Sequence, residues 1–156
     1  MDRFLHVSQR LYTDLGRTTR FFLQPQQLSR WLCQAASVSE DGKGLILTAP
    51  LPDLVWEWQL LTVKREEYLE AAVTDFLTDN STRRFQVEVC LMKCTSKTEY
   101  CSEIHLIQRG FGETEDESAL RGRYLAFWQE KLEALRQHVN GKWVIEDRDL
   151  TLDLFR

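Results

Sequence analysis

The stretch ALRGRYLAFWQEKLEALRQHV, residues 119–139, decides the fold that we predict for this chain. Its apolar residues recur at three- and four-residue spacings, as on one face of an α-helix: Leu120, Tyr124, Phe127, Trp128, Leu132, Leu135 and Val139. Thr114 and Glu117 form a capping-box pattern ahead of it, and Asn140 and Gly141 are typical of a helix stop. We therefore expect a long amphipathic helix over Glu115–Val139 whose aromatic stripe lies against another layer of the protein.

Most of the chain ahead of this helix has the alternation of β-strands. Apolar residues occupy every second position, between short polar turns, in Asp53–Val63, Tyr68–Phe76, Arg84–Lys93 and Thr98–Phe111. A first strand is expected over Phe4–Tyr12, followed by two short helices that begin after Asp14 and at Pro25. Weaker strand signals cover Gln34–Ser39 and Leu45–Thr48. The pattern predicts an α+β fold in which a curved antiparallel sheet wraps its apolar face around the long helix.

Length and composition are those of one globular domain. The chain has 156 residues, of which 43% are hydrophobic and 28% charged, and its 7 Gly and 3 Pro leave little room for linkers. A net charge of −4 without a basic stripe argues against a nucleic-acid partner. No apolar run reaches the roughly 18 residues of a membrane span, and the first residues lack a signal-peptide pattern. We expect a cytoplasmic protein with no membrane partner.

The four cysteines, at positions 33, 90, 94 and 101, have no CxxC spacing. In a cytoplasmic chain we expect all four to be reduced. A zinc site built from Cys90, Cys94 and Cys101 is disfavoured, because thiols on extended strands lack the turn geometry of a zinc knuckle. We predict neither a metal site nor a cofactor.

Four stretches resemble, in order along the chain, the SRPBCC superfamily of START-like, helix-grip proteins. They are QPQQLSRWL (24–32), WEWQLLTVKREEYLEAAVTDF (56–76), TEYCSEIHLIQRGFG (98–112) and FWQEKLEAL (127–135). Within the superfamily they are most similar to the family related to the activator of the heat-shock-protein-90 ATPase. The resemblance implies a helix-grip fold, often with an apolar small molecule between sheet and helix. Two positions depart from the family pattern: Phe127 replaces the usual Gly and predicts a smaller cavity, and Gln108 replaces a frequent His.

The aromatic residues of the helix have two interpretations. In the first, Tyr124, Phe127 and Trp128 only fill the core. In the second, the inward faces of neighbouring elements line a cavity for a small apolar or aromatic ligand, and its residues are Trp56, Trp58, Ser102, Gln108, Tyr124 and Trp128. We predict from the second a non-enzymatic binding module. Two alternatives stay open: a protein-interaction module such as a chaperone ATPase regulator, by family likeness only, and a cyclase- or hydrolase-like enzyme.

The strand pattern does not favour catalysis. Most acidic and imidazole groups of the strands lie opposite the apolar rows: Glu57, Glu70, Glu88, Glu103 and His105. Asp75 is the one carboxylate that we expect near the inner face, at a strand end. We predict no catalytic residue.

The last part of the chain, residues 141–156, is expected to be an extension of a single domain over residues 1–140. Leu150, Leu152 and Leu154 alternate with other residues, as in a strand. Because so much apolar surface is rarely exposed, we expect the tail either to fold back on its own domain or to add to a sheet edge of a second copy as a homodimer.

Overall fold

The structure, a computed structural model, describes residues 3–51, 54–77, 82–94 and 101–155, without the side chains of residues 77 and 140–155. Its elements in chain order are β1 (Arg3–Leu11), α1 (Leu15–Leu23), α2 (Pro25–Trp31), β2 (Ala35–Val38), β3 (Gly44–Thr48), β4 (Leu54–Lys64), β5 (Tyr68–Leu77), β6 (Thr82–Lys93), β7 (Ser102–Phe111) and α3 (Glu115–Phe155).

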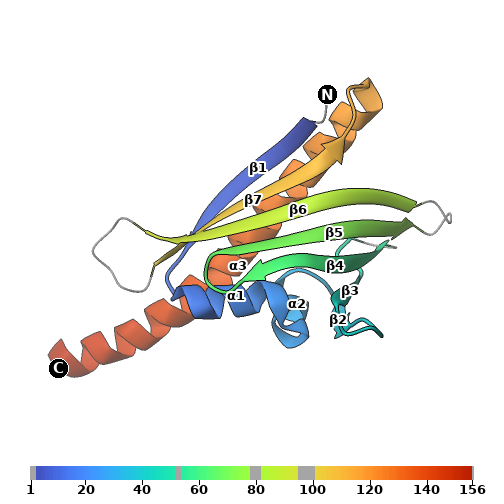
Figure 1. Ribbon diagram of the computed structural model, residues 1–156. Helices are drawn as coiled ribbons and strands as arrows, with labels where there is room; N and C mark the ends of the chain where they lie inside the picture. Colours follow the sequence, from blue (N-terminus) through green and yellow to red (C-terminus); the bar gives the residue numbers. More distant parts are fainter. Residues whose placement is uncertain (1–2, 52–53, 78–81, 95–100, 156) are drawn as a thin grey trace.

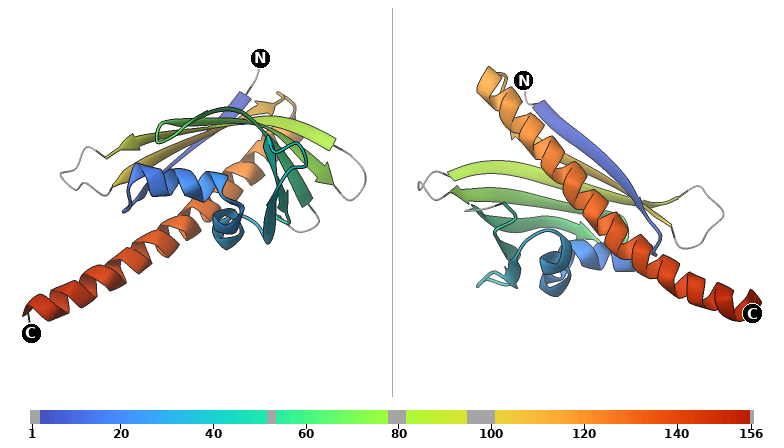
Figure 2. Two further views of the ribbon diagram at one scale, coloured as in Figure 1. Left: turned by 60° about the horizontal axis from the view of Figure 1, so that its bottom comes forward. Right: turned by 180° about the vertical axis from the view of Figure 1, so that it is seen from behind.

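The strands form one antiparallel sheet in the order β1-β7-β6-β5-β4-β3-β2. The sheet curves over α3, which crosses its inner side, and α1 and α2 lie at the same side of the sheet (Figure 1, Figure 2). This is the predicted α+β helix-grip arrangement. Because β7 inserts between β6 and β1, the first strand of the chain lies at one end of the sheet.

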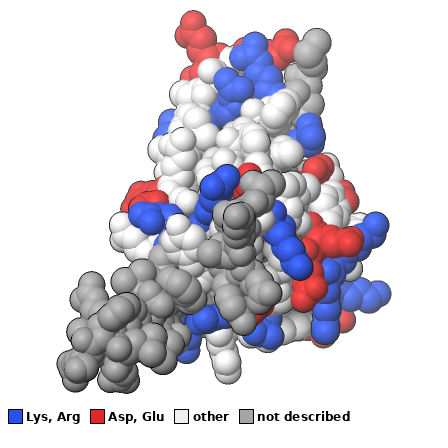
Figure 3. Space-filling view, turned by 90° about the vertical axis from the view of Figure 1, so that its left-hand side faces the viewer, with Lys and Arg blue, Asp and Glu red and all other residues white. Residues whose placement is uncertain are grey.

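The alternation seen in the sequence matches the two faces of the sheet. Leu5 and Val7 of β1 and Ile104 and Leu106 of β7 are buried, while their neighbours along the strands are exposed or half-buried. The stripe of α3 meets this inner face, and Trp128, Leu132 and Leu135 are fully buried there. Sheet and helix therefore bury each other, as predicted. On the face shown in Figure 3, basic and acidic side chains are interspersed.

The two short helices begin where the sequence predicts. Asp14 caps α1 by accepting a hydrogen bond from the backbone N–H of Arg17 at 2.7 Å, and Pro25 is the first residue of α2. The two helices are joined through Trp31, whose Nε1 donates to the carbonyl of Phe21 at 2.9 Å. In the described part of the chain, we find no helix with the length and apolar character needed to cross a bilayer.

The predicted end of the long helix is wrong. α3 begins at Glu115, with the Glu117 N–H donating to Thr114 Oγ1 at 3.2 Å, but it continues through Asn140 and Gly141 to Phe155. A glycine inside a helix costs only about 1 kcal/mol relative to alanine, so a single Asn-Gly pair does not oblige the helix to end. The strand predicted from the alternating leucines at 150, 152 and 154 is wrong for the same segment, which is helical and projects beyond the sheet (Figure 2).

The prediction of four reduced cysteines is also wrong, because Cys94 and Cys101 form a disulfide. Lys93 pairs with Ser102 at the end of the β6–β7 ladder, so the next residue on each side is a cysteine, with Cα atoms 5.3 Å apart. The sequence places both cysteines near a turn but does not fix the strand register that aligns them. Cys33 and Cys90 are free.

Candidate ligand site

A cluster of aromatic rings lies between β4 and α3, with Trp56 of β4 at its centre. The ring centroid of Trp56 is 6.1 Å from that of Trp58, 6.3 Å from Tyr124, 5.4 Å from Phe127 and 5.7 Å from Trp128. All five side chains are buried. The alternation of β4 turns its two tryptophans to the inner face, and the three- and four-residue spacing of α3 turns the other three toward them.

The structure buries all six residues of the predicted cavity and brings five of them together. Trp56, Trp58, Tyr124 and Trp128 belong to the ring cluster. Gln108 of β7 joins them because its Oε1 accepts a hydrogen bond from Trp128 Nε1 at 2.7 Å. The amide oxygen of Gln108 thus satisfies the buried indole N–H of Trp128.

Ser102, the sixth residue, has polar partners elsewhere. It stands at the start of β7, where its hydroxyl donates to the carbonyl of Thr13 at 2.7 Å and accepts from Thr18 Oγ1 at 3.0 Å. These buried bonds tie β7 to the start of α1. Period-2 alternation correctly places Ser102 on the inner face. Its partners come from the residue Thr13 before α1 and from Thr18 within α1, and the sequence pattern does not reveal this pairing.

Asp75 of β5 lies at the edge of the ring cluster and is 4% exposed, as expected from its place in the strand. Its Oδ2 accepts a hydrogen bond from the hydroxyl of Tyr124. Burial raises the pKa of Asp75 to about 6, against the opposing effects of the Tyr124 hydroxyl and the Trp56 indole. Burial also raises the pKa of Tyr124, and the negative charge of Asp75 adds to that shift. The phenol therefore remains the donor.

Three buried polar atoms at this site have no hydrogen-bond partner among the described residues. They are the indole nitrogens of Trp56 and Trp58 and the second carboxylate oxygen, Oδ1, of Asp75. Trp56 and Asp75 face each other across the β4–β5 ladder, and the Trp56 indole is near enough to lower the pKa of the carboxyl group. The two groups nevertheless do not meet the geometry of a hydrogen bond. Buried donors and acceptors are paired in the great majority of cases, because an unpaired one costs roughly 1–3 kcal/mol. The site thus presents two donors and one acceptor inside an aromatic enclosure.

The polar groups present favour binding through hydrogen bonds. In the part of the chain that the structure describes, no three His, Cys, Asp or Glu side chains gather in a way that would hold a metal ion. Three cavities lined by described residues lie elsewhere, of about 280, 310 and 630 Å³, and none of the six predicted residues lines them. Within the enclosure, the ring of Trp56 is in contact with the four rings around it, at centroid distances of 5.4–6.3 Å.

Sequence reasoning missed other members of the enclosure. Phe85 of β6 and Phe111 of β7 lie 5.1 and 6.0 Å from the ring of Tyr124, measured between centroids. Phe85 is buried on the inner face of β6, but the alternation of a single strand does not tell which ring of α3 it meets. Its cross-strand neighbour at position 110 is a glycine with φ +115°, where a Cβ would lie 3.3 Å from the Phe85 ring.

Comparison with solved structures agrees with this architecture. Protein MLL2253 from Mesorhizobium loti is 19% identical, with a TM-score of 0.66 over 86% of this chain and 95% of that chain. XoxI from Bacillus cereus is 14% identical, with a TM-score of 0.67 over 87% of this chain and 94% of that chain. DynU16, a protein of the dynemicin biosynthetic locus, is 12% identical, with a TM-score of 0.69 over 88% of this chain and 47% of that chain.

These similarities establish the fold and leave the function to the site. No protein-family model matches the sequence, and no curated protein matches it either. At such low identity a shared fold does not transfer an activity, since the same architecture serves many functions.

Proposed function

We propose that this protein binds a small, largely aromatic ligand between the sheet and α3, with one hydrogen-bonding end of the ligand at Trp56, Trp58 and Asp75. The observation that carries the proposal is the set of unpaired polar atoms in the ring cluster. A hydroxyl group can accept from an indole N–H and donate to the carboxylate oxygen. A ligand with a phenol-like end thus relieves polar atoms that the protein alone leaves unsatisfied.

The ligand's body would lie among the aromatic rings. Aromatic pairs favour offset-stacked and edge-to-face contacts, and the cluster already uses both: Trp56 stacks on Trp128 and meets Phe127 edge to face. Because the rings are already in contact, binding requires Trp56 or Trp58 to move aside as the ligand enters. The proposed site includes five of the six residues predicted from the sequence, and Ser102 remains a prediction as a ligand contact.

A matched pair of small molecules tests the proposal. We expect 2-naphthol to raise the melting temperature more than naphthalene, because only the first carries a hydroxyl. A ligand at a hundred times its Kd stabilises the native state by about 2.7 kcal/mol. Binding of 2-naphthol should also shift the indole N–H resonances of Trp56 and Trp58 in an NMR spectrum.

Variants assign the effect to the site. Trp58→Phe removes one unpaired donor and should reduce the preference for 2-naphthol over naphthalene. Trp31→Phe is the control, because the indole of Trp31 donates to Phe21 outside the cluster. If neither compound shifts the melting temperature of the wild-type protein, or if Trp58→Phe keeps the full preference, the proposal is wrong.

A second candidate is a protein-interaction module of the type related to the activator of the heat-shock-protein-90 ATPase. The resembling stretches occupy defined places in the fold: Pro25 begins α2, Phe111 ends β7, and Trp128 faces the sheet. Exposed apolar side chains on β4, Leu61 and Val63, offer a contact surface. Stimulation of the purified chaperone's ATPase by this protein, lost in Val63→Asp but kept in Thr62→Asp, would support it; no stimulation would dismiss it.

A further inference from the structure

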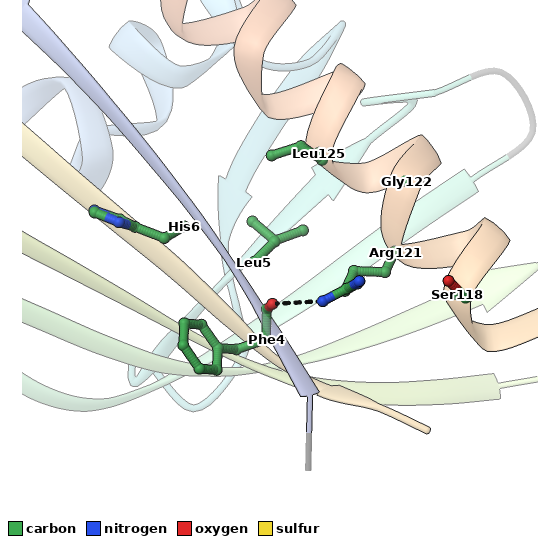
Figure 4. A pocket seen from close by; sticks show the side chains of 7 residues that line it. All are labelled: Phe4, Leu5, His6, Ser118, Arg121, Gly122 and Leu125. Atoms are coloured by element: carbon green, nitrogen blue, oxygen red, sulfur yellow. Dashed lines mark hydrogen bonds between the residues drawn. The ribbon is translucent and has the colours of Figure 1, made fainter. Parts of the chain in front are cut away.

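A groove separate from the aromatic cluster runs between the first strand and the beginning of α3. Its volume is about 280 Å³, and it is lined by Phe4–His6 of β1 and by Ser118, Arg121, Gly122 and Leu125 of α3 (Figure 4). We call it the edge groove, because β1 is the end strand of the sheet. None of the six ligand-binding residues predicted from the sequence lines this groove.

The backbone of β1 faces the edge groove. Within the described residues, β1 pairs with a strand on one side only, β7. The carbonyl of Phe4 accepts a hydrogen bond from Arg121 Nη1 at 3.4 Å, so it points toward α3 and away from β7. Outward-facing amide groups recur every second residue along an edge strand, so those of His6 face the same way. Such a row of groups is a template for another strand.

Side chains leave this backbone accessible. The rings of Phe4 and His6 point to the side of β1 away from α3, whereas Leu5 points toward Leu125 (Figure 4). On that outer side, His6 Nε2 lies 3.0 Å from Nδ1 of His105, and the guanidinium of Arg109 lies 5.1 Å from the Phe4 ring. These contacts hold the two rings out of the edge groove.

Gly122 lines the α3 side of the edge groove and has no side chain to fill it. It is an exposed residue inside a helix, where glycine is less favourable than alanine. Close packing does not demand it, because a Cβ at this position would meet no atom within 4 Å. The glycine therefore serves no contact within the described structure, but it widens the space between α3 and the β1 edge.

Arg121 supplies the charge of the edge groove. Within the described residues, its one hydrogen bond is the long bond to the Phe4 carbonyl, which uses one of the five N–H donors of a guanidinium. A carboxylate matches such a fork with two parallel hydrogen bonds, and it is the anionic group that protein side chains supply. Serine and backbone groups at the same site add neutral hydrogen-bonding capacity.

We propose that the edge groove binds an extended segment of a partner protein, which adds to β1 as a strand and places an acidic side chain on Arg121. Main-chain hydrogen bonds to Phe4 and His6 supply affinity, and the ion pair with Arg121 makes the groove prefer segments that carry an acidic side chain. Gly122 leaves room for the added chain beside α3. This interaction surface is independent of the proposed interior ligand, so either proposal can fail without the other.

Selection from a library of random octapeptides displayed on phage tests the proposal. We expect enrichment of peptides rich in Val, Ile and Thr that carry an Asp or Glu. Binding of a synthesised winner, measured by fluorescence anisotropy, should weaken about tenfold or more in Arg121→Glu, because attraction becomes repulsion. Gly122→Leu should abolish it by filling the edge groove without disturbing a neighbour. The controls are Arg123→Glu and Ala126→Leu, which change exposed positions of α3 outside the groove.

Hydrogen exchange supplies the structural readout. In the free protein the amides of Phe4 and His6 should exchange faster than those of Leu5 and Val7, and the bound peptide should protect them. The proposal is overturned if no peptide is enriched, if the winners bind Gly122→Leu as well as the wild type, or if bound peptide leaves the Phe4 and His6 amides unprotected.

Discussion

Two fully buried tryptophans show different uses of the same side chain. Trp128 of α3 and Trp58 of β4 both have no exposed surface, and both contact Trp56. The N–H of Trp128 donates to Gln108, whereas the N–H of Trp58 has no partner in the described structure. Trp128 is therefore a completed core contact, and Trp58 belongs to a region that the protein alone leaves incomplete.

The difference concerns whole regions. Where α3 meets β7, polar groups inside the fold are paired, as in the bond between Trp128 and Gln108. Where α3 meets β4 and β5, Asp75 keeps one oxygen unpaired beside two unpaired indoles. A fold that needed only a core would gain stability by replacing these polar atoms with apolar ones. Their presence is the reason to look for a ligand there.

The largest expected effect comes from removing the completed contact. Trp128→Ala should destabilise the protein by about 3–5 kcal/mol, because it leaves a large buried cavity and removes the hydrogen-bond donor of the Gln108 amide oxygen. Chemical denaturation followed by circular dichroism measures it. A denaturation midpoint equal to that of the wild type would show that Trp128 is not part of the core, and the contrast drawn here between Trp128 and Trp58 would then be wrong.

The second effect is a pH dependence at the incomplete region. Because burial raises the pKa of Asp75 to about 6, the native state keeps a proton that the unfolded chain releases near pH 4. The contribution of Asp75 to the free energy of unfolding is at its maximum below about pH 4 and is lost as the pH rises through about 6. The loss amounts to about 3 kcal/mol, and Asp75→Asn should remove it.

Denaturation at pH 4 and pH 7 measures this difference between wild type and Asp75→Asn. Tyr124→Phe sharpens the assignment. It removes a hydrogen bond that stabilises the carboxylate, so the pKa of Asp75 in the native state should rise further and the upper end of the pH window should move to higher pH. If Asp75→Asn and the wild type lose the same stability between the two pH values, Asp75 is not the buried acid described here.

The sequence predicts the layers of this protein better than it predicts the contacts within them. Period-2 and 3.6-residue patterns depend only on burial, so they place Trp56, Asp75 and Trp128 correctly on inner faces. Pairing of polar atoms depends on register and on curvature. The sequence therefore could not tell that Gln108 would reach Trp128 while Trp58 would remain without a partner.

The predictions that the structure corrects have the same origin. Cys94 and Cys101 meet because the β6–β7 ladder ends at Lys93 and Ser102, a register that no local pattern fixes. The helix continues past Gly141 because local stop signals are worth only about 1 kcal/mol and are easily overridden. A single sequence does not predict features that depend on small free-energy differences or on contacts between residues far apart in the chain.

The smallest effect is the most direct test of the comparison, because one substitution is made at both tryptophans. Trp128→Phe and Trp58→Phe remove the same ring volume from fully buried sites. Trp128→Phe also leaves Gln108 Oε1 without its donor, whereas Trp58→Phe removes an N–H that was unpaired. We therefore expect Trp128→Phe to be more destabilising by about 1–3 kcal/mol, the cost of one unsatisfied buried polar group.

Parallel denaturation of the two variants measures the difference, in which the shared loss of ring volume cancels. Equal destabilisation would mean that Trp58 has a partner in solution, such as a bound water, and that the β4 side of the enclosure is as complete as the β7 side.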